Sequence, residues 1–320
     1  MQFFPGTRDA WFTVIKEKVL ELVERIGKED FYLPGSLKDI YKKKIVYVLE
    51  FILEIIRVNR SAVLEDLLYS PKARGIYKIS DRAELERILQ YVEGVIQAPR
   101  EDFRLFEDIP TPIYGPLKIE YFSPLSPSDK IIKLNDKKTI RFIDPLMYRL
   151  NFLDCKADKV LVTGFDFEEL IEKNVAEKLN CLLIGLGNPI ARSTRHLLRR
   201  LNLELNLPVY ILTEATPAGL LQSISLIRGP SEPAPQFLQK FIVSHALWVG
   251  VSIGDLQEGF KTLSLSGEDV KILERIRDST LSKLPPYKQE LELYDEKKVK
   301  SGYTELKNLN IVEYISSKIP

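Results

Sequence analysis

Cysteine and histidine are scarce in this chain, and their scarcity excludes several kinds of site. Only two cysteines, Cys155 and Cys181, occur in 320 residues, and they form no CxxC pair. Neither has a histidine close to it in the sequence, so no zinc site is predicted. Two cysteines also provide no disulfide framework, which favours a reducing compartment.

Long apolar runs and an excess of positive charge are also missing. No run approaches the roughly 20 residues that a helix needs to span a bilayer, and the first residues do not resemble a signal peptide. We therefore expect a cytoplasmic protein with no membrane partner. With 46 basic and 45 acidic residues, the net charge of +1 does not indicate nucleic-acid binding. Any DNA contact must come from local clusters.

The first part of the chain has the apolar spacing of helices. Three long helices are predicted, at residues 8–27, 37–58 and 82–97. A short helix is expected over 62–69, stopped by Pro71, and an extended segment is expected around 113–121. A winged-helix or helix-turn-helix unit typically has this order: a helix, a turn, a short helix, a further helix and an extended segment.

The later part of the chain alternates between strand and helix patterns. Buried strands are predicted at residues 159–163, 181–185 and 207–213, with helices at 166–178, at 190–202 and from Pro217. This alternation predicts a parallel sheet covered by helices, whose ligands bind at the carboxyl ends of the strands. The predicted fold is mixed α/β. We expect a helical domain over 1–121, a linker with some strands of its own over 122–158, and a sheet domain with a C-terminal extension over 159–320.

Several motifs in a shared order resemble one protein family over roughly residues 45–260. They are Asn59–Tyr69, Val92–Phe103, Gly115–Leu117, Gly187–Pro189 with Thr194-Arg195 and Leu201, Leu207–Gly219, and Trp248–Leu256. Together they resemble the A subunit of topoisomerase VI and the meiotic double-strand-break protein related to it. The resemblance implies a winged-helix domain, a Rossmannoid Toprim-type sheet, and a C2 dimer that encloses duplex DNA. It places the nucleophilic tyrosine at Tyr69. It assigns Mg²⁺ to carboxylates of the sheet domain and ATP to a separate B-type subunit, so no ATP site is expected here.

The sequence departs from the family pattern at the positions that carry out the chemistry. Glu65 stands where the family has an arginine, and a carboxylate repels the phosphate that the arginine would stabilise. Gly164 and Thr216 replace two of the three expected metal ligands, which leaves Glu214 as the third. These departures predict impaired cleavage. The alternative is a displaced ligand beside Glu214, supplied by Asp166, Glu168 or Glu169.

Candidate DNA contacts lie on two predicted helices. Most of the arginines of the second sheet-domain helix share one side of it; the four are Arg192, Arg195, Arg199 and Arg200. Lys42, Lys43 and Lys44 begin the second long helix. Each group can contact phosphates, but each also suits a solvated face or a dimer rim. Glu214 could equally serve as a helix N-cap, since acidic groups are favoured there. Tyr69 could have a purely structural role at the end of its helix.

Three classes of function remain open. We favour a chromosome-associated DNA-binding homodimer that does not cleave. The second class is an active tyrosine transesterase, a topoisomerase or double-strand-break subunit with an altered metal site. The third is an interaction subunit that pairs with an A-type paralogue or a B-type ATPase through the helix at 8–27. A cleavage assay with Mg²⁺ or Mn²⁺ separates the first two.

Overall fold

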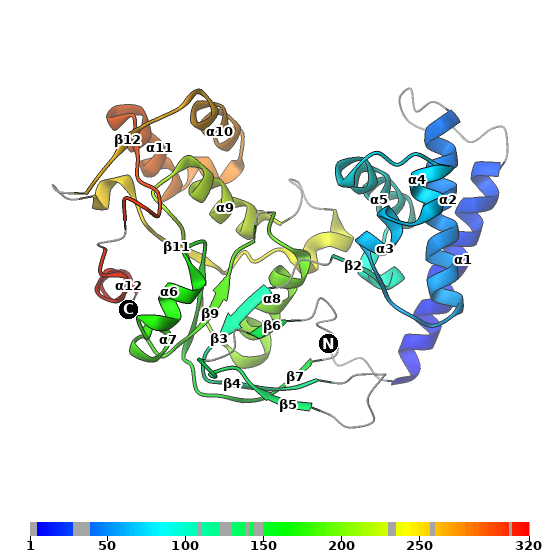
Figure 1. The fold of residues 1–320 in the computed structure, drawn as a ribbon, viewed down its shortest axis with the longest axis horizontal. Helices are drawn as coiled ribbons and strands as arrows, with labels where there is room; N and C mark the ends of the chain where they lie inside the picture. Colours follow the sequence, from blue (N-terminus) through cyan, green and yellow to red (C-terminus); the bar gives the residue numbers. More distant parts are fainter. Residues whose placement is uncertain are drawn as a thin grey trace. The chain divides into compact units, whose positions relative to one another are not determined.

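The computed structural model forms two compact units, each with its own hydrophobic core. The first contains Met1–Asp108 with Pro235–Leu238, and the second contains Ile109–Ala234 with Gln239–Pro320. The structure describes residues 5–27, 39–107, 111–121, 130–137, 141–143, 150–187, 189–229, 235–256, 260–306 and 309–319. Figure 1 shows the elements of both units.

Three long helices build the core of the first unit: α1 (Pro5–Gly27), α2 (Asp39–Arg57) and α5 (Arg82–Ile96). Apolar residues three or four positions apart face inward on each helix, for example Ile15 and Val19 on α1 and Leu85 and Leu89 on α5, all fully buried. The structure therefore confirms the three predicted long helices (Figure 1).

Short elements follow α2 and α5 in the first unit. They are β1 (Ala62–Val63), α3 (Leu64–Leu68), α4 (Pro71–Gly75), the 3-10 helix η1 (Arg100–Phe103) and β2 (Leu105–Phe106). The helix predicted over 62–69 is shorter than expected, because its first two residues pair in parallel with β2. This pairing joins segments that are more than forty positions apart, which local periodicity does not reveal.

A mixed six-stranded sheet organises the second unit, in the order β11-β10-β8-β9-β3-β6. Its strands are β3 (Thr111–Tyr114), β6 (Arg141–Ile143), β8 (Lys159–Thr163), β9 (Cys181–Gly185), β10 (Val209–Leu212) and β11 (Leu247–Gly250). Strands β11, β10, β8 and β9 are parallel, whereas β3 runs antiparallel to β9 and β6. The predicted strands at 159–163 and 181–185 are confirmed with the same bounds.

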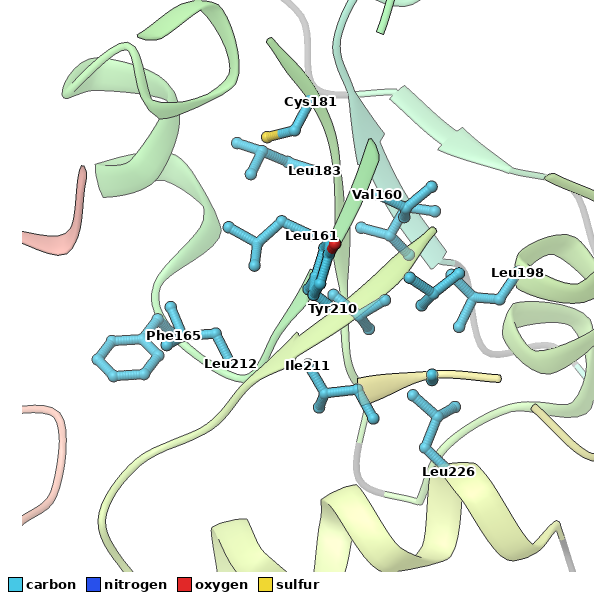
Figure 2. Close-up of a cluster of buried hydrophobic side chains, with 14 of the residues drawn as sticks. Val160, Leu161, Phe165, Cys181, Leu183, Leu198, Tyr210, Ile211, Leu212 and Leu226 are labelled. Atoms are coloured by element: carbon cyan, nitrogen blue, oxygen red, sulfur yellow. The ribbon is translucent and has the colours of Figure 1, made fainter. Parts of the chain in front are cut away.

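Helices cover both faces of this sheet. They are α6 (Phe167–Glu172), α7 (Val175–Lys178), α8 (Arg192–Leu205) and α9 (Pro217–Arg228). Figure 2 shows Val160 and Ile211 on the face of Leu198 and Leu226, while Leu161 lies on the opposite face. Strands β8, β9 and β10 are buried on both faces, which is why they are continuous apolar runs in the sequence.

The boundary between the units differs from the expected one at residue 121. Strands β3 and β4 (Leu117–Tyr121) belong to the second unit, and β4 lies between β5 (Lys130–Lys133) and β7 (Leu150–Cys155) in an antiparallel sheet. The expected linker over 122–158 thus contributes β5, β6 and β7. Some strands were expected in this range, but its polar composition hides their bounds, because only one face of the three-stranded sheet packs against the core.

The last part of the chain adds further elements to the second unit. They are η3 (Gln236–Phe241, whose first residues belong to the first unit), η4 (Ile253–Asp255), β12 (Leu263–Ser264), α10 (Gly267–Arg277), η5 (Thr280–Lys283), α11 (Tyr287–Lys297), β13 (Val299–Lys300) and α12 (Ile311–Lys318). After β13 the chain returns to the main sheet, where Ser301 forms a bridge with Ala215 just beyond β10. No helix in the described ranges has the length and apolar character required to cross a membrane.

Candidate functional site

Tyr69 closes α3, and its backbone is held on both sides. Its N–H donates to the Glu65 carbonyl at 2.9 Å. The next residue, Ser70, caps α4 by accepting from the Ala73 N–H at 3.0 Å. The Ser70 hydroxyl is also hydrogen-bonded to the hydroxyl of Tyr47. These contacts fix the backbone of the tyrosine without burying its ring.

The side chain of Tyr69 is 61% exposed, and the guanidinium of Arg74 lies 4.7 Å from its ring centroid. A tyrosine that ends a helix for structural reasons normally buries its ring, because the ring carries most of its packing energy. The exposed phenol is therefore accessible to a large ligand. Its assignment as the nucleophile remains a prediction from the motif.

Glu65 is not free to repel a phosphate with its full charge. Its Oε1 accepts from Nη1 of Arg82 at 2.9 Å, in a partly exposed ion pair. The next residue, Asp66, accepts from the backbone N–H of Val63 at 3.0 Å. Both carboxylates of α3 thus have hydrogen-bond partners within the first unit.

The carboxyl end of β10 is closed by the protein's own hydrogen bonds. Thr216 caps α9 by accepting from the Gly219 N–H at 3.0 Å, and its side chain is largely buried. Glu214 is therefore not the helix cap, which was the alternative role considered for it. Instead its Oε1 accepts from the backbone N–H of Tyr303 at 2.9 Å. The ring of Tyr303 in turn meets Phe165 edge-on, at 6.0 Å between centroids.

The residues at this sheet end do not fit an Mg²⁺ ion. Mg²⁺ requires an octahedron of oxygen ligands, usually with one or two carboxylates. Gly164 has no side chain, the Thr216 hydroxyl serves the helix cap, and one oxygen of Glu214 serves Tyr303. Asp166 caps α6 at the Glu169 N–H. Among the described residues, no group of three His, Cys, Asp or Glu side chains is placed to hold a metal.

Burial raises the pKa of Glu214, and the nearby carboxylate of Glu305 raises it further, against the opposing charge of Lys300. A carboxyl group with a raised pKa in the folded state binds its proton more tightly than the unfolded chain does. Its stabilising contribution is therefore present below the unfolded pKa of about 4.3 and is lost as pH rises through the folded pKa.

Replacing Glu214→Gln is accordingly expected to raise the melting temperature at pH 7, by about 1–3 °C, and to have less effect at pH 4. Glutamine keeps an oxygen for the Tyr303 N–H and removes the buried charge. Glu214→Ala should lower the melting temperature, because it leaves that N–H unpaired. Differential scanning calorimetry at both pH values, with the exposed Glu172→Gln as control, checks the prediction. A Gln variant less stable than wild type at pH 7 would contradict it.

Two of the four candidate arginines on α8 are buried. Arg195 is 3% exposed, and its Nη1 donates to the carbonyls of Ser225 at 2.6 Å and Leu226 at 3.0 Å, near the end of α9. A cation is favourable at this negative end of a helix. Arg192 is 5% exposed and lies over the ring of Phe241. The predicted phosphate contacts of Arg192 and Arg195 are therefore not expected, because their buried side chains offer no surface to DNA.

The other two arginines of α8 are less buried but have partners within the second unit. Arg199 donates to the carbonyl of Gln239. Arg200 forms two hydrogen bonds with Glu204, at 2.5 and 2.9 Å, and a third with the Leu150 carbonyl at 3.0 Å. A DNA contact by either arginine would have to replace these bonds.

The three lysines at the start of α2 differ in burial. Lys44 is 6% exposed and forms an ion pair with Glu84 at 2.5 Å. Lys43 is exposed and Lys42 is half-buried. Lys42 and Lys43 therefore remain predicted DNA contacts, whereas Lys44 has a structural role.

Helical periodicity does not single out a basic stretch around Tyr69. Residues 57–78 hold five basic side chains against two acidic ones, in a chain whose net charge is +1. The five are all exposed: Arg57, Arg60, Lys72, Arg74 and Lys78. A running count of charge along the sequence would have found this stretch.

Comparisons with known proteins agree with this layout. Residues 163–319 match the family model described as the Toprim domain of Spo11 and of the topoisomerase 6 A subunit. The chain is 28% identical over 238 residues to the type 2 DNA topoisomerase 6 A subunit of Archaeoglobus fulgidus, covering 73% of this chain and 66% of that protein. The corresponding protein of Methanothermobacter thermautotrophicus is 26% identical, with 69% and 62% covered. That of Halobacterium salinarum is 27% identical, with 72% and 64% covered.

The chain thus spans slightly less than two thirds of the length of these relatives. The Toprim match begins at the end of β8 and includes β9, β10 and α9, the elements that form the parallel core of the second unit. The curated matches extend over more of the chain than the Toprim model does. By sequence the chain is similar to topoisomerase VI A subunits, and its residues 163–319 match the Toprim domain of that family.

Proposed function

We propose that this chain is a member of the topoisomerase VI A family that binds duplex DNA and does not cleave it. The proposal rests on the hydrogen bonds of the side chains at the carboxyl end of β10. The one acidic residue retained there, Glu214, is hydrogen-bonded to the Tyr303 backbone, and Thr216 caps a helix. Both are engaged in holding the fold together.

The chemistry of cleavage explains why this arrangement matters. Attack by a tyrosine oxygen on a phosphodiester needs help, because a phenol with a pKa of about 10 is a poor nucleophile at neutral pH. A metal ion supplies that help by neutralising charge on the phosphate. The donor set around Glu214 does not suit Mg²⁺, and Glu65 stands where a cation would assist Tyr69.

The proposed architecture follows the family. The first unit would be a winged-helix domain, with α3, α4 and α5 beside the DNA, and two copies of the chain would form a dimer on the duplex. The exposed basic residues of 57–78 support this orientation, because phosphate contacts supply most of the affinity in binding without sequence preference. The protein would act at the chromosome, alone or with a B-type ATPase or an A-type paralogue.

The test combines cleavage with binding. Purified protein is mixed with supercoiled plasmid and Mg²⁺ or Mn²⁺, with and without a B-type partner and ATP, and stopped with detergent and protease. We expect the plasmid to remain uncut, while gel shifts reveal binding that weakens steeply with salt.

Tyr69→Phe runs beside the wild type as the matched control, since it keeps the ring and removes the phenol oxygen. Linear DNA with a protein-blocked 5′ end, abolished by this substitution, would refute the non-cleaving proposal. It would establish an active transesterase with an altered metal site. An uncut plasmid without any gel shift would refute the DNA-binding part and favour an interaction module.

A further inference from the structure

Arg74 is unusual among the arginines of this chain because its charge is exposed but its position is restrained. Its guanidinium stacks over the ring of Tyr69 at 4.7 Å. It has no ion pair with another residue in the described part of the chain. By contrast, Arg82, Arg100 and Arg200 all pair with carboxylates.

The backbone beneath Arg74 is anchored. Ala73 is fully buried, and its carbonyl accepts from the Ile79 N–H at 3.0 Å. The Lys72 carbonyl accepts from the N–H groups of Ile76 and Tyr77, each at 3.0 Å. Tyr77 stacks on Tyr47 at 4.5 Å between centroids, which ties this turn to α2. The side chains of Lys72 and Arg74 therefore project from a fixed turn.

The local charge is suited to an anion. The two carboxylates near Tyr69 in the sequence already have partners, Glu65 with Arg82 and Asp66 with the Val63 N–H. A guanidinium offers a planar pair of donors that matches the oxygens of a phosphate. Because the Tyr69 ring already restricts the guanidinium, binding costs less side-chain entropy than it would for a free arginine.

We propose that Arg74, stacked on Tyr69, is a binding site for one backbone phosphate of duplex DNA. The site would hold a phosphate beside Tyr69, but it does not supply the metal ion that cleavage requires. It rests on the proposed function, since it assumes that the first unit lies against DNA. The phenol oxygen of Tyr69 is a second donor to the same phosphate.

The test is a salt series of binding measurements with the full chain and a fluorescent duplex of about 20 base pairs, followed by anisotropy. Arg74→Gln should weaken binding about 10-fold at low salt and reduce the slope of log K against log salt by about 1. Arg74→Lys should keep the slope, because it keeps the charge, and lose part of the affinity. Tyr69→Ala should weaken binding more than Tyr69→Phe, since only the former removes the stacking ring.

Arg275→Gln is the matched control, because Arg275 is an exposed arginine on α10 without an ion pair in the described structure. If Arg74→Gln behaves like Arg275→Gln while the wild type binds with a steep salt dependence, the Arg74 site is wrong and the proposed function stands. If the wild type shows no salt-dependent binding, the proposed function fails, and the Arg74 site fails with it.

Discussion

Arg100→Met is expected to destabilise the first unit by about 3–5 kcal/mol. The Arg100 side chain is fully buried, with Nη2 3.1 Å from Glu93 and Nη1 2.8 Å from Glu86. Burial alone would lower the pKa of Arg100, but the carboxylates of Glu93 and Glu86 raise it, so the guanidinium stays charged. Methionine fills much of the volume but leaves the Glu93 carboxylate, only 1% exposed, without its counter-charge.

Urea unfolding followed by circular dichroism measures this effect. Arg82→Met is the comparison, because the Arg82–Glu65 ion pair is partly exposed and should contribute less than about 1 kcal/mol. Adding Glu93→Gln to Arg100→Met should recover part of the loss, since it removes the uncompensated charge. An Arg100→Met variant within about 1 kcal/mol of wild type would show that the buried cluster is not needed for stability.

The second large effect is expected at Gly115, where β3 turns into β4. Its φ of +141° is a backbone conformation that L side chains rarely adopt. A Cβ placed there would lie 2.8 Å from the Cys181 carbonyl oxygen and 3.2 Å from the Cα of Leu182. Both atoms belong to the backbone of β9, in the middle of the main sheet. Gly115→Ala should therefore cost about 2–4 kcal/mol, combining backbone strain with displacement of β9.

Thermal unfolding of the full chain checks this prediction, with Gly267→Ala as control. Gly267 begins α10 in the same unit, and an added Cβ there meets no atom within 4 Å. The control should melt close to the wild type. If Gly115→Ala melts with it, the tight approach to β9 is not a constraint on the fold.

Strands β8 and β9 could be predicted to the residue, because a strand buried on both faces leaves an uninterrupted apolar run. The helix expected over 166–178 instead divides into α6 and α7, where Asn174 adopts a left-handed conformation with φ of 56°. Strands were expected within the linker over 122–158, but the bounds of β5 and β7 were not predicted. Their pairing with β4 is a long-range contact, and no local pattern specifies it.

The candidate site was predictable where it follows motifs and unpredictable where it depends on neighbours. Helical spacing correctly placed the arginines on α8, but a polar stripe does not reveal what it faces. Arg195 faces the carbonyl end of α9, and Arg200 the Leu150 carbonyl. Glu214 was found as an acidic strand end, whereas its partner Tyr303 lies 89 positions later in the sequence.

The contact between Glu214 and Tyr303 also bears on how readily this protein could change during evolution. New carboxylates at positions 164 and 216 would not by themselves assemble a full metal site, because one of the two carboxylate oxygens of Glu214 would still be bound to the backbone of Tyr303. Releasing it would leave the partly buried N–H of Tyr303 unpaired, at a cost of about 1 kcal/mol. Single substitutions toward a metal site would thus be neutral or harmful until the segment around Tyr303 had moved. The hydrogen bond between Glu214 and Tyr303 therefore makes a return to a metal-binding arrangement slow.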